Sequence, residues 1–215
     1  MSSMTPASPI TLPEVCQQRL QHLLAIGGRQ ILGLVAAPGA GKSTLAQAIQ
    51  DQFGDLVQVV PMDGFHLANS ELQRLGRRNR KGAPDTFDAA GYVNLLRRIH
   101  AQPADEVVYA PEYRREFEEA IAGAIAVLPL TRLIVTEGNY LLLPEAPWNQ
   151  VTEVLDEVWY LDVPDALRHE RLLARHMRFG RTEQQALDWM ASTDEPNAVR
   201  IAQCRSRADV QVPWY

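Results

Sequence analysis

The stretch "AAPGAGKST", Ala36 to Thr44, lies between an apolar run and an amphipathic one, and it decides the fold. It fits the phosphate-loop pattern G-x-x-x-x-G-K-[ST] except at Ala36, where the pattern has its first glycine. A glycine-rich turn between a strand and a helix points successive backbone N–H groups inward, at the positive end of the helix dipole. Because Ala36 stands at the end of the strand and adds one methyl group, we expect nucleotide phosphates to bind here nonetheless.

The flanking segments supply the strand and the helix that such a loop needs. "ILGLVA", residues 31–36, predicts a buried strand, and "LVQVVP", residues 56–61, predicts a second one. Between them apolar residues recur every four positions until Gly54, at Leu45, Ile49 and Phe53. Strand, turn, helix and strand in this order predict a right-handed crossover unit in a parallel sheet.

The rest of the chain continues the alternation of strands and helices. Further strands are predicted at residues 132–138, 157–163 and 208–212. Helix starts are indicated by a capping-box pattern over 11–14, by Asp88, by Pro164, by the pair Thr182 and Gln185, and by Pro196. We therefore expect an α/β fold of three layers, with a mostly parallel five-stranded sheet in a single domain over 11–215 and a flexible N-terminus over 1–10.

Composition narrows the class of protein. The chain has 215 residues, 46% of them hydrophobic, and a formal net charge of −5, which argues against nucleic acid or an anionic membrane as a partner. No apolar run approaches the ~18 residues of a membrane span. Cys16 and Cys204 lack the spacing of a zinc site or a disulfide framework. With no signal-peptide pattern at the start, we expect a cytoplasmic protein with two buried thiols.

Lysine is scarce: only Lys42 and Lys81 occur among 21 basic residues. A compact ammonium does a different job from a guanidinium, so both positions are candidates for chemistry. Lys42 is expected to reach the β- and γ-phosphates, and the Ser43 hydroxyl to ligate Mg²⁺. For Lys81 a plain surface lysine is an equal alternative. The predicted nucleotide-binding residues of the loop are Pro38, Gly39, Ala40, Gly41, Lys42, Ser43 and Thr44.

Asp63 follows the second predicted strand in "VVPMDGFHL". A carboxylate facing the γ-phosphate can accept the proton of an attacking hydroxyl, which contributes roughly 10²–10⁴-fold to the rate. Asp-Gly is also a common turn pair, so the dipeptide alone favours a turn. The phosphate loop upstream makes a catalytic base the preferred interpretation.

Four motifs in order resemble one known family. "APGAGKST", "PMDGFHL", "RKGAPDTFD" (80–88) and "IVTEGNYLLL" (134–143) are similar to the phosphate-loop kinases of the uridine kinase, pantothenate kinase and phosphoribulokinase group. Within this group the chain most resembles bacterial nucleoside/nucleotide kinase-like proteins that are called fructose transport system kinases. The resemblance covers about residues 31–212, and it implies the P-loop NTPase fold with a helical lid.

The resemblance also implies roles for particular residues. Asp63 falls on the general base, and Glu137 on the acid that supports Mg²⁺ or its waters. The segments that match "KGAPDTFD" and "YAPEYRR" (109–115) border the acceptor pocket, although related proteins tend to have aspartate at Arg114. In uridine kinases the loop that adjoins the strand similar to "ADVQVP" borders the adenine, which makes Asp209 the candidate contact; a plain strand residue is the alternative. The acceptor-binding candidates are His66, Lys81, Tyr113 and Arg115. His66 could instead be a capped histidine and Tyr113 a core residue. Glu137 could instead be a plain charge at the end of a strand.

The predicted helix after Pro164 carries a row of arginines. At 100° per residue, Arg168, Arg171, Arg175 and Arg178 share one face, and Ala166, Leu173, Ala174 and Met177 lie opposite. A solvated charged face is one interpretation. The other is a lid that closes over the nucleotide and neutralises the transferring phosphoryl group. Related kinases have a lid here, which makes Arg171 and Arg175 the leading catalytic candidates, followed by Arg178 and Arg181.

These residues predict an ATP-dependent, Mg²⁺-requiring kinase that phosphorylates a hydroxyl of a small metabolite, which could be a nucleoside, a sugar or a pantothenate-like alcohol. A nucleotide-binding or nucleotide-hydrolysing regulatory protein is the alternative, and a degenerate member that keeps nucleotide as a structural element is a third. The N-K-x-D motif of guanine-specific switches does not occur. The oligomeric state is open, with a homodimer among the alternatives.

Overall fold

The computed structural model describes residues 10–215. A five-stranded sheet has the order β2-β5-β1-β6-β7, and every pair of neighbouring strands in it is parallel. Its strands are β1 (Gln30–Val35), β2 (Val57–Val59), β5 (Leu133–Gly138), β6 (Glu157–Asp162) and β7 (Val210–Pro213). All five strands were predicted, and β5 inserts between β2 and β1.

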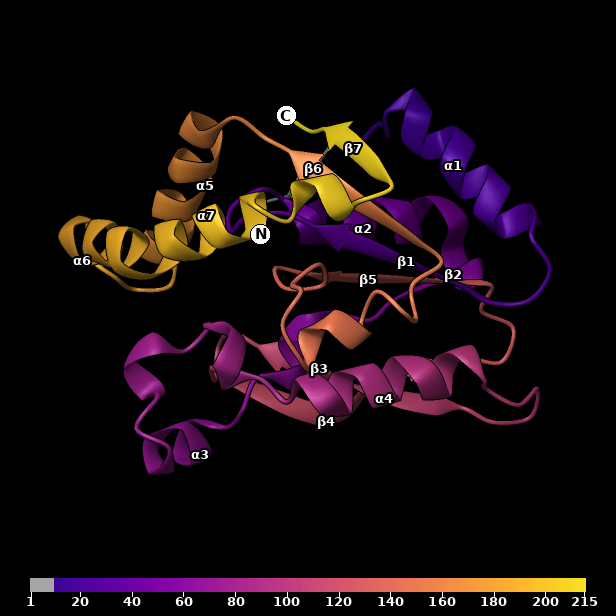
Figure 1. The fold of residues 1–215 in the computed structure, drawn as a ribbon, viewed down its shortest axis with the longest axis horizontal. Coiled ribbons are helices and arrows are strands. Elements are labelled where there is room, and N and C mark those ends of the chain that lie inside the picture. Colours follow the sequence, from indigo (N-terminus) through magenta and orange to yellow (C-terminus); the bar gives the residue numbers. More distant parts are fainter. Residues whose placement is uncertain (1–9) are drawn as a thin grey trace, which may run out of the picture.

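Helices cover both faces of this sheet, as the three-layer prediction requires (Figure 1). On one face, α1 (Glu14–Ala25) and α2 (Lys42–Phe53) bury Leu20, Leu45 and Ile49 against the sheet. On the other face, α4 (Ala89–His100) buries Tyr92 and Leu96. The remaining helices are α3 (Asn69–Arg74), α5 (Asp165–Arg178), α6 (Glu183–Trp189) and α7 (Glu195–Ala202).

Most of the predicted helix starts are confirmed. The Asp88 side chain accepts a hydrogen bond from the N–H of Gly91, and Thr182 with Gln185 forms a capping box. The capping box predicted over 11–14 is wrong, because α1 begins at Glu14 after Pro13 and has no side-chain cap. The N-terminus predicted to be flexible, 1–10, lies outside the described residues except for Ile10. None of the helices within 10–215 is long and apolar enough to cross a membrane.

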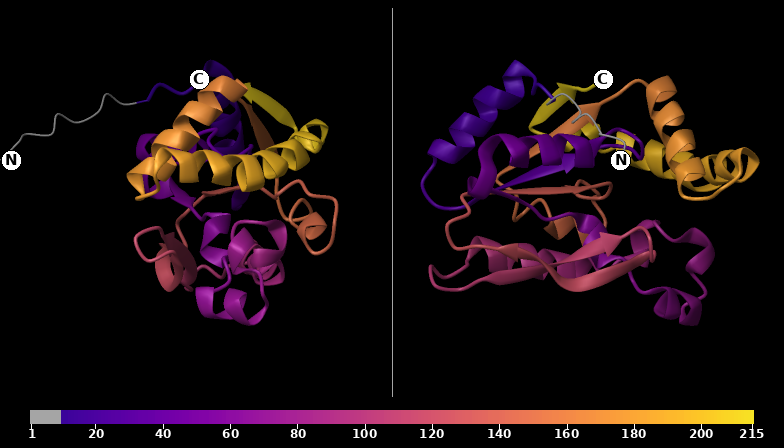
Figure 2. Two further views of the ribbon diagram at one scale, coloured as in Figure 1. Left: turned by 90° about the vertical axis from the view of Figure 1, so that its left-hand side faces the viewer. Right: turned by 180° about the vertical axis from the view of Figure 1, so that it is seen from behind.

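An antiparallel hairpin of β3 (Val108–Arg114) and β4 (Glu119–Val127) was not predicted. Its second strand, "EAIAGAIAV", is rich in alanine and has Gly123 at a register shift, so it lacks the β-branched alternation that signals a strand. The hairpin and α3 lie on one side of the sheet's carboxyl edge, and α5, α6 and α7 lie on the other (Figures 1 and 2). The two groups of elements therefore face each other across that edge.

Candidate active site

The phosphate loop joins β1 to α2 and offers free backbone donors. Gly39 and Gly41 take φ values of +82° and +88°, which glycine adopts at little cost. Within residues 10–215, no protein acceptor pairs with the N–H groups of Gly39, Gly41, Lys42, Ser43 and Thr44. Five unpaired donors at a helix N-terminus are what a polyphosphate needs. Ala36 is fully buried in the apolar cluster beneath α2, so its methyl group packs into the core and leaves these donors unobstructed.

Lys42 folds back on the loop. Its Nζ donates to the carbonyl of Ala36 at 3.0 Å and to Oδ1 of Asn139 at 2.7 Å. Burial lowers the pKa of Lys42 to about 8, although the carboxylates of Glu137 and Asp63 act in the opposite direction. Asn139 follows β5 in the "GNY" segment, and sequence analysis missed it because an asparagine after a glycine also reads as a plain turn.

Ser43 and Glu137 meet at the start of α2. The Ser43 hydroxyl donates to Oε1 of Glu137 at 2.8 Å, and Glu137 is only 6% exposed at the end of β5. Burial and the nearby Asp63 raise the pKa of Glu137, while Lys42 and the Ser43 hydrogen bond oppose the shift. Within 10–215 no cluster of three His, Cys, Asp or Glu residues could cage a metal. One hydroxyl and one carboxylate fit Mg²⁺, which prefers phosphate and water oxygens for the remaining positions.

Asp63 lies in the 3-10 turn Met62–Phe65 that follows β2. A Cβ on Gly64 would come within 2.3 Å of the Pro111 carbonyl, so the glycine lets the β3–β4 hairpin approach this turn. Arg115, at the tip of the hairpin, places its Nη2 3.4 Å from Oδ2 of Asp63. Asp63 therefore sits in a turn and also faces the cavity, so the two interpretations of its sequence are compatible.

The other acceptor candidates gather around Tyr113. The ring of His66 lies between those of Phe87 and Tyr113, with centroids 4.0 and 4.6 Å away, and its Nδ1 is 2.8 Å from the Asp63 carbonyl. Burial lowers the pKa of His66. The Nζ of Lys81 lies 5.3 Å from the centroid of the Tyr113 ring. Arg114 points away from the cavity and pairs with Glu112 at 2.7 Å, because alternate residues of a strand face opposite sides.

The arginine face of α5 packs inward from Arg168 to Arg175, which argues against the solvated-face alternative. Arg168 is 4% exposed, and its guanidinium donates to the Pro38 carbonyl at 2.9 Å and lies 3.3 Å from Glu195. It is thus a buried link between the phosphate loop and α7. The face predicted to be apolar is the solvent side, with Met177 47% exposed. Leu172, not Leu173, is the fully buried leucine of α5.

The other arginines divide into two groups. Arg171 reaches the Ala40 carbonyl at 3.4 Å, and burial lowers the pKa of Arg175. Both line the cavity together with Arg181, whose guanidinium lies 4.0 Å from the centroid of the Trp189 ring. Arg178 is exposed and does not line the cavity, so its role as a lid residue stays a prediction.

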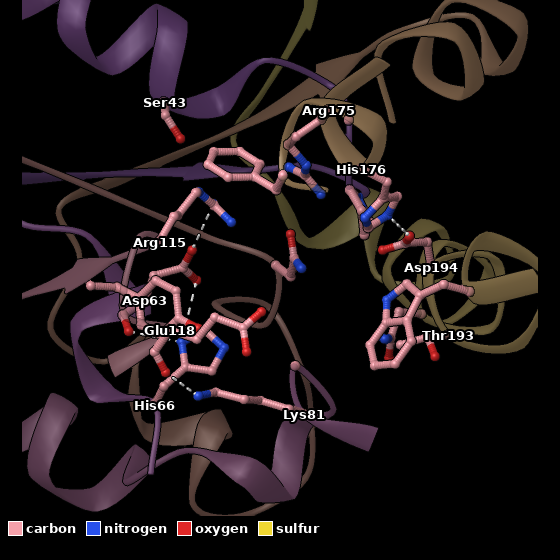
Figure 3. A pocket seen from close by; sticks show the side chains of 18 of the residues that line it. Ser43, Asp63, His66, Lys81, Arg115, Glu118, Arg175, His176, Thr193 and Asp194 are labelled. Carbon is pink, nitrogen blue, oxygen red and sulfur yellow. Dashed lines mark hydrogen bonds and ion pairs between the residues drawn. The ribbon is translucent and has the colours of Figure 1, made fainter. Parts of the chain in front are cut away.

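All these segments surround one cavity of about 1050 Å³ (Figure 3). It brings together every predicted site residue except Ala40, Arg178 and Asp209; Ala40 is buried under the loop. Asp209 is exposed at the opposite, amino end of the strands, where its carboxylate accepts from the N–H of Val158; its predicted adenine contact is therefore wrong. Lining residues that sequence analysis missed are Asn69, Arg78, Asn139, His176, Trp189, Thr193, Asp194 and Asn197.

His176 and Asp194 form a pair within the cavity wall, with Nε2 and Oδ2 2.8 Å apart (Figure 3). Asp194 ends a π-helical turn, Met190–Asp194, which joins α6 to α7 without a break. The sequence predicts a new helix start at Pro196, but the helix runs on through Pro196 from α6, so that predicted start is wrong. Thr193 and Asp194 of the π-helical turn line the cavity. π-Helical turns occur frequently at functional sites, but their sequence signal is weak.

A parallel sheet with a phosphate loop after β1, acids after β2 and β5, and arginine-bearing helices after β6 defines the class of P-loop kinases. The comparisons with known proteins identify one family within this class. Residues 31–215 match the model of the Phosphoribulokinase / Uridine kinase family, and the chain belongs to that family.

Three relatives illustrate the family. A protein of Schizosaccharomyces pombe described as a candidate uridine kinase is 33% identical over 87% of this chain and 84% of its own length. The pantothenate kinase of Ligilactobacillus salivarius is 29% identical over 67% of this chain and 48% of its own length. The crystal structure of a candidate fructose transport system kinase from Silicibacter sp. TM1040 superimposes with a TM-score of 0.83 at 40% identity, covering 95% of this chain and all of that one. Family and relatives together indicate a kinase that acts on a small molecule.

Proposed function

We propose that the protein is an ATP-dependent, Mg²⁺-requiring kinase that transfers the γ-phosphoryl group to a hydroxyl of a small metabolite. The observation that carries this proposal is the position of Asp63 on the same cavity as Lys42 and the Ser43–Glu137 pair. A protein that only binds or hydrolyses nucleotide has no need of a carboxylate facing an acceptor pocket. We assign the activity to one domain over 11–215.

The reaction is an in-line displacement. The acceptor oxygen forms a bond to the γ-phosphorus, the bond from that phosphorus to the β,γ-bridging oxygen breaks, and ADP leaves with the electron pair. The proton of the acceptor hydroxyl passes to the Asp63 carboxylate. Arg115 holds this carboxylate at 3.4 Å, and it must release Asp63 or move with it when the acceptor binds.

The remaining residues position and neutralise charge, which is most of what phosphoryl transfer requires. The loop N–H groups and Lys42 bind the phosphates. Arg171 and Arg175 on α5 offset the charge on the transferring group, and closure of α5 to α7 over the cavity excludes water. Mg²⁺, held through Ser43 and Glu137, supplies electrostatic stabilisation of the phosphate oxygens when it is bound.

The acceptor is the open part of the proposal. The relatives named above are called kinases of uridine, of pantothenate and of a fructose transport system, so the family uses one donor site with several acceptors. His66, Lys81, Tyr113 and Arg115 are the proposed acceptor contacts. The absence of nucleic-acid and membrane partners, the cytoplasmic location and the oligomeric state stay predictions.

The test is ADP formation by the purified protein with ATP, Mg²⁺ and a panel of nucleosides, sugars and hydroxy acids. We expect turnover that requires one acceptor class, a loss of about 10²–10⁴-fold in Asp63→Asn, and none in the control Asp55→Asn, an exposed acid outside the cavity. Acceptor-independent hydrolysis that Asp63→Asn leaves unchanged would support the regulatory alternative and reject the kinase.

A further inference from the structure

Lys81 lies on the acceptor side of the cavity, and within residues 10–215 it has no carboxylate partner. Lys42 and Lys81 are the chain's two lysines, and both line this cavity. Within residues 10–215, neither has a carboxylate oxygen within 4.0 Å. Lys42 has an evident anionic ligand in the nucleotide phosphates. Among the described residues Lys81 is unpaired in the same way as Lys42, but no ligand has yet been assigned to it.

Among the described residues, the hydrogen bonds of Lys81 go to neutral oxygens. Its Nζ donates to Oδ1 of Asn69 at 2.8 Å and to the backbone carbonyl of Glu118 (Figure 3). The side chain is half-buried, and burial lowers the pKa of Lys81. Removing a cation from water is costly unless an opposite charge compensates for it, so an anion that binds Lys81 would offset the cost of its partial burial. The ammonium has three N–H donors, two of which have these acceptors, and Lys81 lines the cavity.

The nearby carboxylates do not provide that compensation. Asp63 lies against Arg115, and Glu119 accepts a hydrogen bond from the N–H of Asn69 at 2.9 Å. Glu116 and Glu118 are exposed at the rim, where water screens them. Glu118 and Glu119 raise the pKa of Lys81, but they act against a larger effect of burial. The charge facing the cavity at Lys81 is therefore positive.

Lys81 and the proposed base belong to the same wall. The Tyr113 ring has the Lys81 ammonium 5.3 Å from its centroid and the Arg115 guanidinium 6.0 Å from it, and that guanidinium contacts Asp63. A single small molecule can therefore reach both Lys81 and Asp63 while it lies against Tyr113.

We propose that the phosphate acceptor is a small hydroxylated anion, a hydroxy acid or a phosphorylated sugar, whose anionic group binds Lys81 while its hydroxyl faces Asp63. This inference rests on the proposed kinase function. The anionic group takes no part in the bonds that change: the acceptor oxygen gains the γ-phosphoryl group, ADP leaves, and the proton goes to Asp63.

The experiment compares acceptors matched for size and hydroxyl pattern: glycerate with glycerol, gluconate with glucitol, and fructose 6-phosphate with fructose. We expect turnover of an anionic member in preference to its neutral partner, and the carboxylates and the phosphate ester identify the source of the charge. Lys81→Gln should raise the KM for the anion about tenfold or more, as the loss of ~1.4 kcal/mol of charge pairing predicts, with kcat less affected. Lys81→Arg should retain part of the binding. Arg80→Gln removes an exposed cation that pairs with Asp85 outside the cavity, and it is the matched control.

Preferential turnover of neutral acceptors, or a KM for the anion that Lys81→Gln leaves unchanged, overturns this inference and leaves the kinase intact. Absence of acceptor-dependent turnover combined with hydrolysis insensitive to Asp63→Asn rejects the kinase itself. If no compound of the panel is turned over, calorimetric binding of inorganic phosphate and acetate decides, with the loop filled by a non-hydrolysable ATP analogue. Binding that Lys81→Gln abolishes supports the inference, and equal or absent binding in both proteins overturns it.

Discussion

Gly39 lies where the phosphate loop meets α5, and its replacement by alanine tests how the loop and the lid are joined. A Cβ at this position would lie 2.7 Å from the backbone oxygen of Arg168 and 2.7 Å from Cγ of Leu172. The first contact is with backbone, which cannot rotate away. Alanine would thus force α5 off the loop or distort the loop itself.

The magnitude follows from two separable terms. Gly39 has a φ of +82°, and a non-glycine residue in this region costs roughly 1–2 kcal/mol. Overpacking in a closely packed region adds about 1–3 kcal/mol. Gly28 has the same φ of +82° with no atom within 4 Å of its Cβ position, so Gly28→Ala carries the first term alone. We expect Gly39→Ala to lose about 2–5 kcal/mol of unfolding free energy and Gly28→Ala about 1–2 kcal/mol.

The two differences in unfolding free energy are measured by urea denaturation of the wild type and both variants, provided that the dependence of the unfolding free energy on urea concentration has the same slope in all three. Affinity for a non-hydrolysable ATP analogue is measured alongside and should fall only in Gly39→Ala. Equal destabilisation of the two variants, or unchanged nucleotide affinity in Gly39→Ala, would refute the close contact between the loop and α5.

Three further predictions follow. Lys42 has a pKa of about 8 in the folded protein against 10.5 for a free lysine, so the folded chain holds fewer protons between these two pH values. Nucleotide binding above pH 8 should therefore take up a proton, and the affinity should weaken as the pH rises. Calorimetry in two buffers of different ionisation enthalpy measures this uptake, with Lys42→Met as control. Arg168→Met should cost about 1–3 kcal/mol because it leaves the Pro38 carbonyl without its buried donor, whereas Glu195 is 35% exposed and keeps His169 at 2.9 Å; denaturation measures the loss, and a stability equal to that of the wild type would contradict the link between the loop and α5. Ala36→Gly, which restores the consensus glycine, should leave ATP affinity unchanged and lower stability by about 0.5–1 kcal/mol, and a gain in affinity would contradict the view that this methyl group only fills core.

The donor half of the site was largely predictable. A strand, a glycine-rich turn and a helix are contiguous in the chain, so the loop residues and Lys42 could be assigned from local pattern alone. Asp63 follows β2 and Glu137 stands at the end of β5, and parallel strands bring their carboxyl ends to one edge wherever they stand in the sheet. The hydrogen bond between Ser43 and Glu137 needed the sheet order, because β5 lies next to β1 although about 100 residues separate them.

The acceptor half was less predictable, because long-range packing builds it. The β3–β4 hairpin has an alanine-rich strand with no alternation, and its position against the turn at Asp63 depends on the absence of a side chain at Gly64. The sequence left a solvated face and a lid as alternatives for the arginines of α5, since a periodicity shows which residues share a face but not which face is buried; the burial of Arg168 argues against the solvated face. A π-helical turn directed Asp194 to the cavity without a sequence signal.

The sequence by itself determined the phosphate loop, the five parallel strands and the two acids at their ends, because backbone geometry and periodicity are local and leave their pattern in adjacent residues. Only the tertiary structure decided which arginines face the phosphates, which residues of α6 and α7 close the cavity, and that Lys81 stands there without a carboxylate. Those facts depend on distances between residues far apart in the chain, which burial and packing set together and which no short stretch of sequence records.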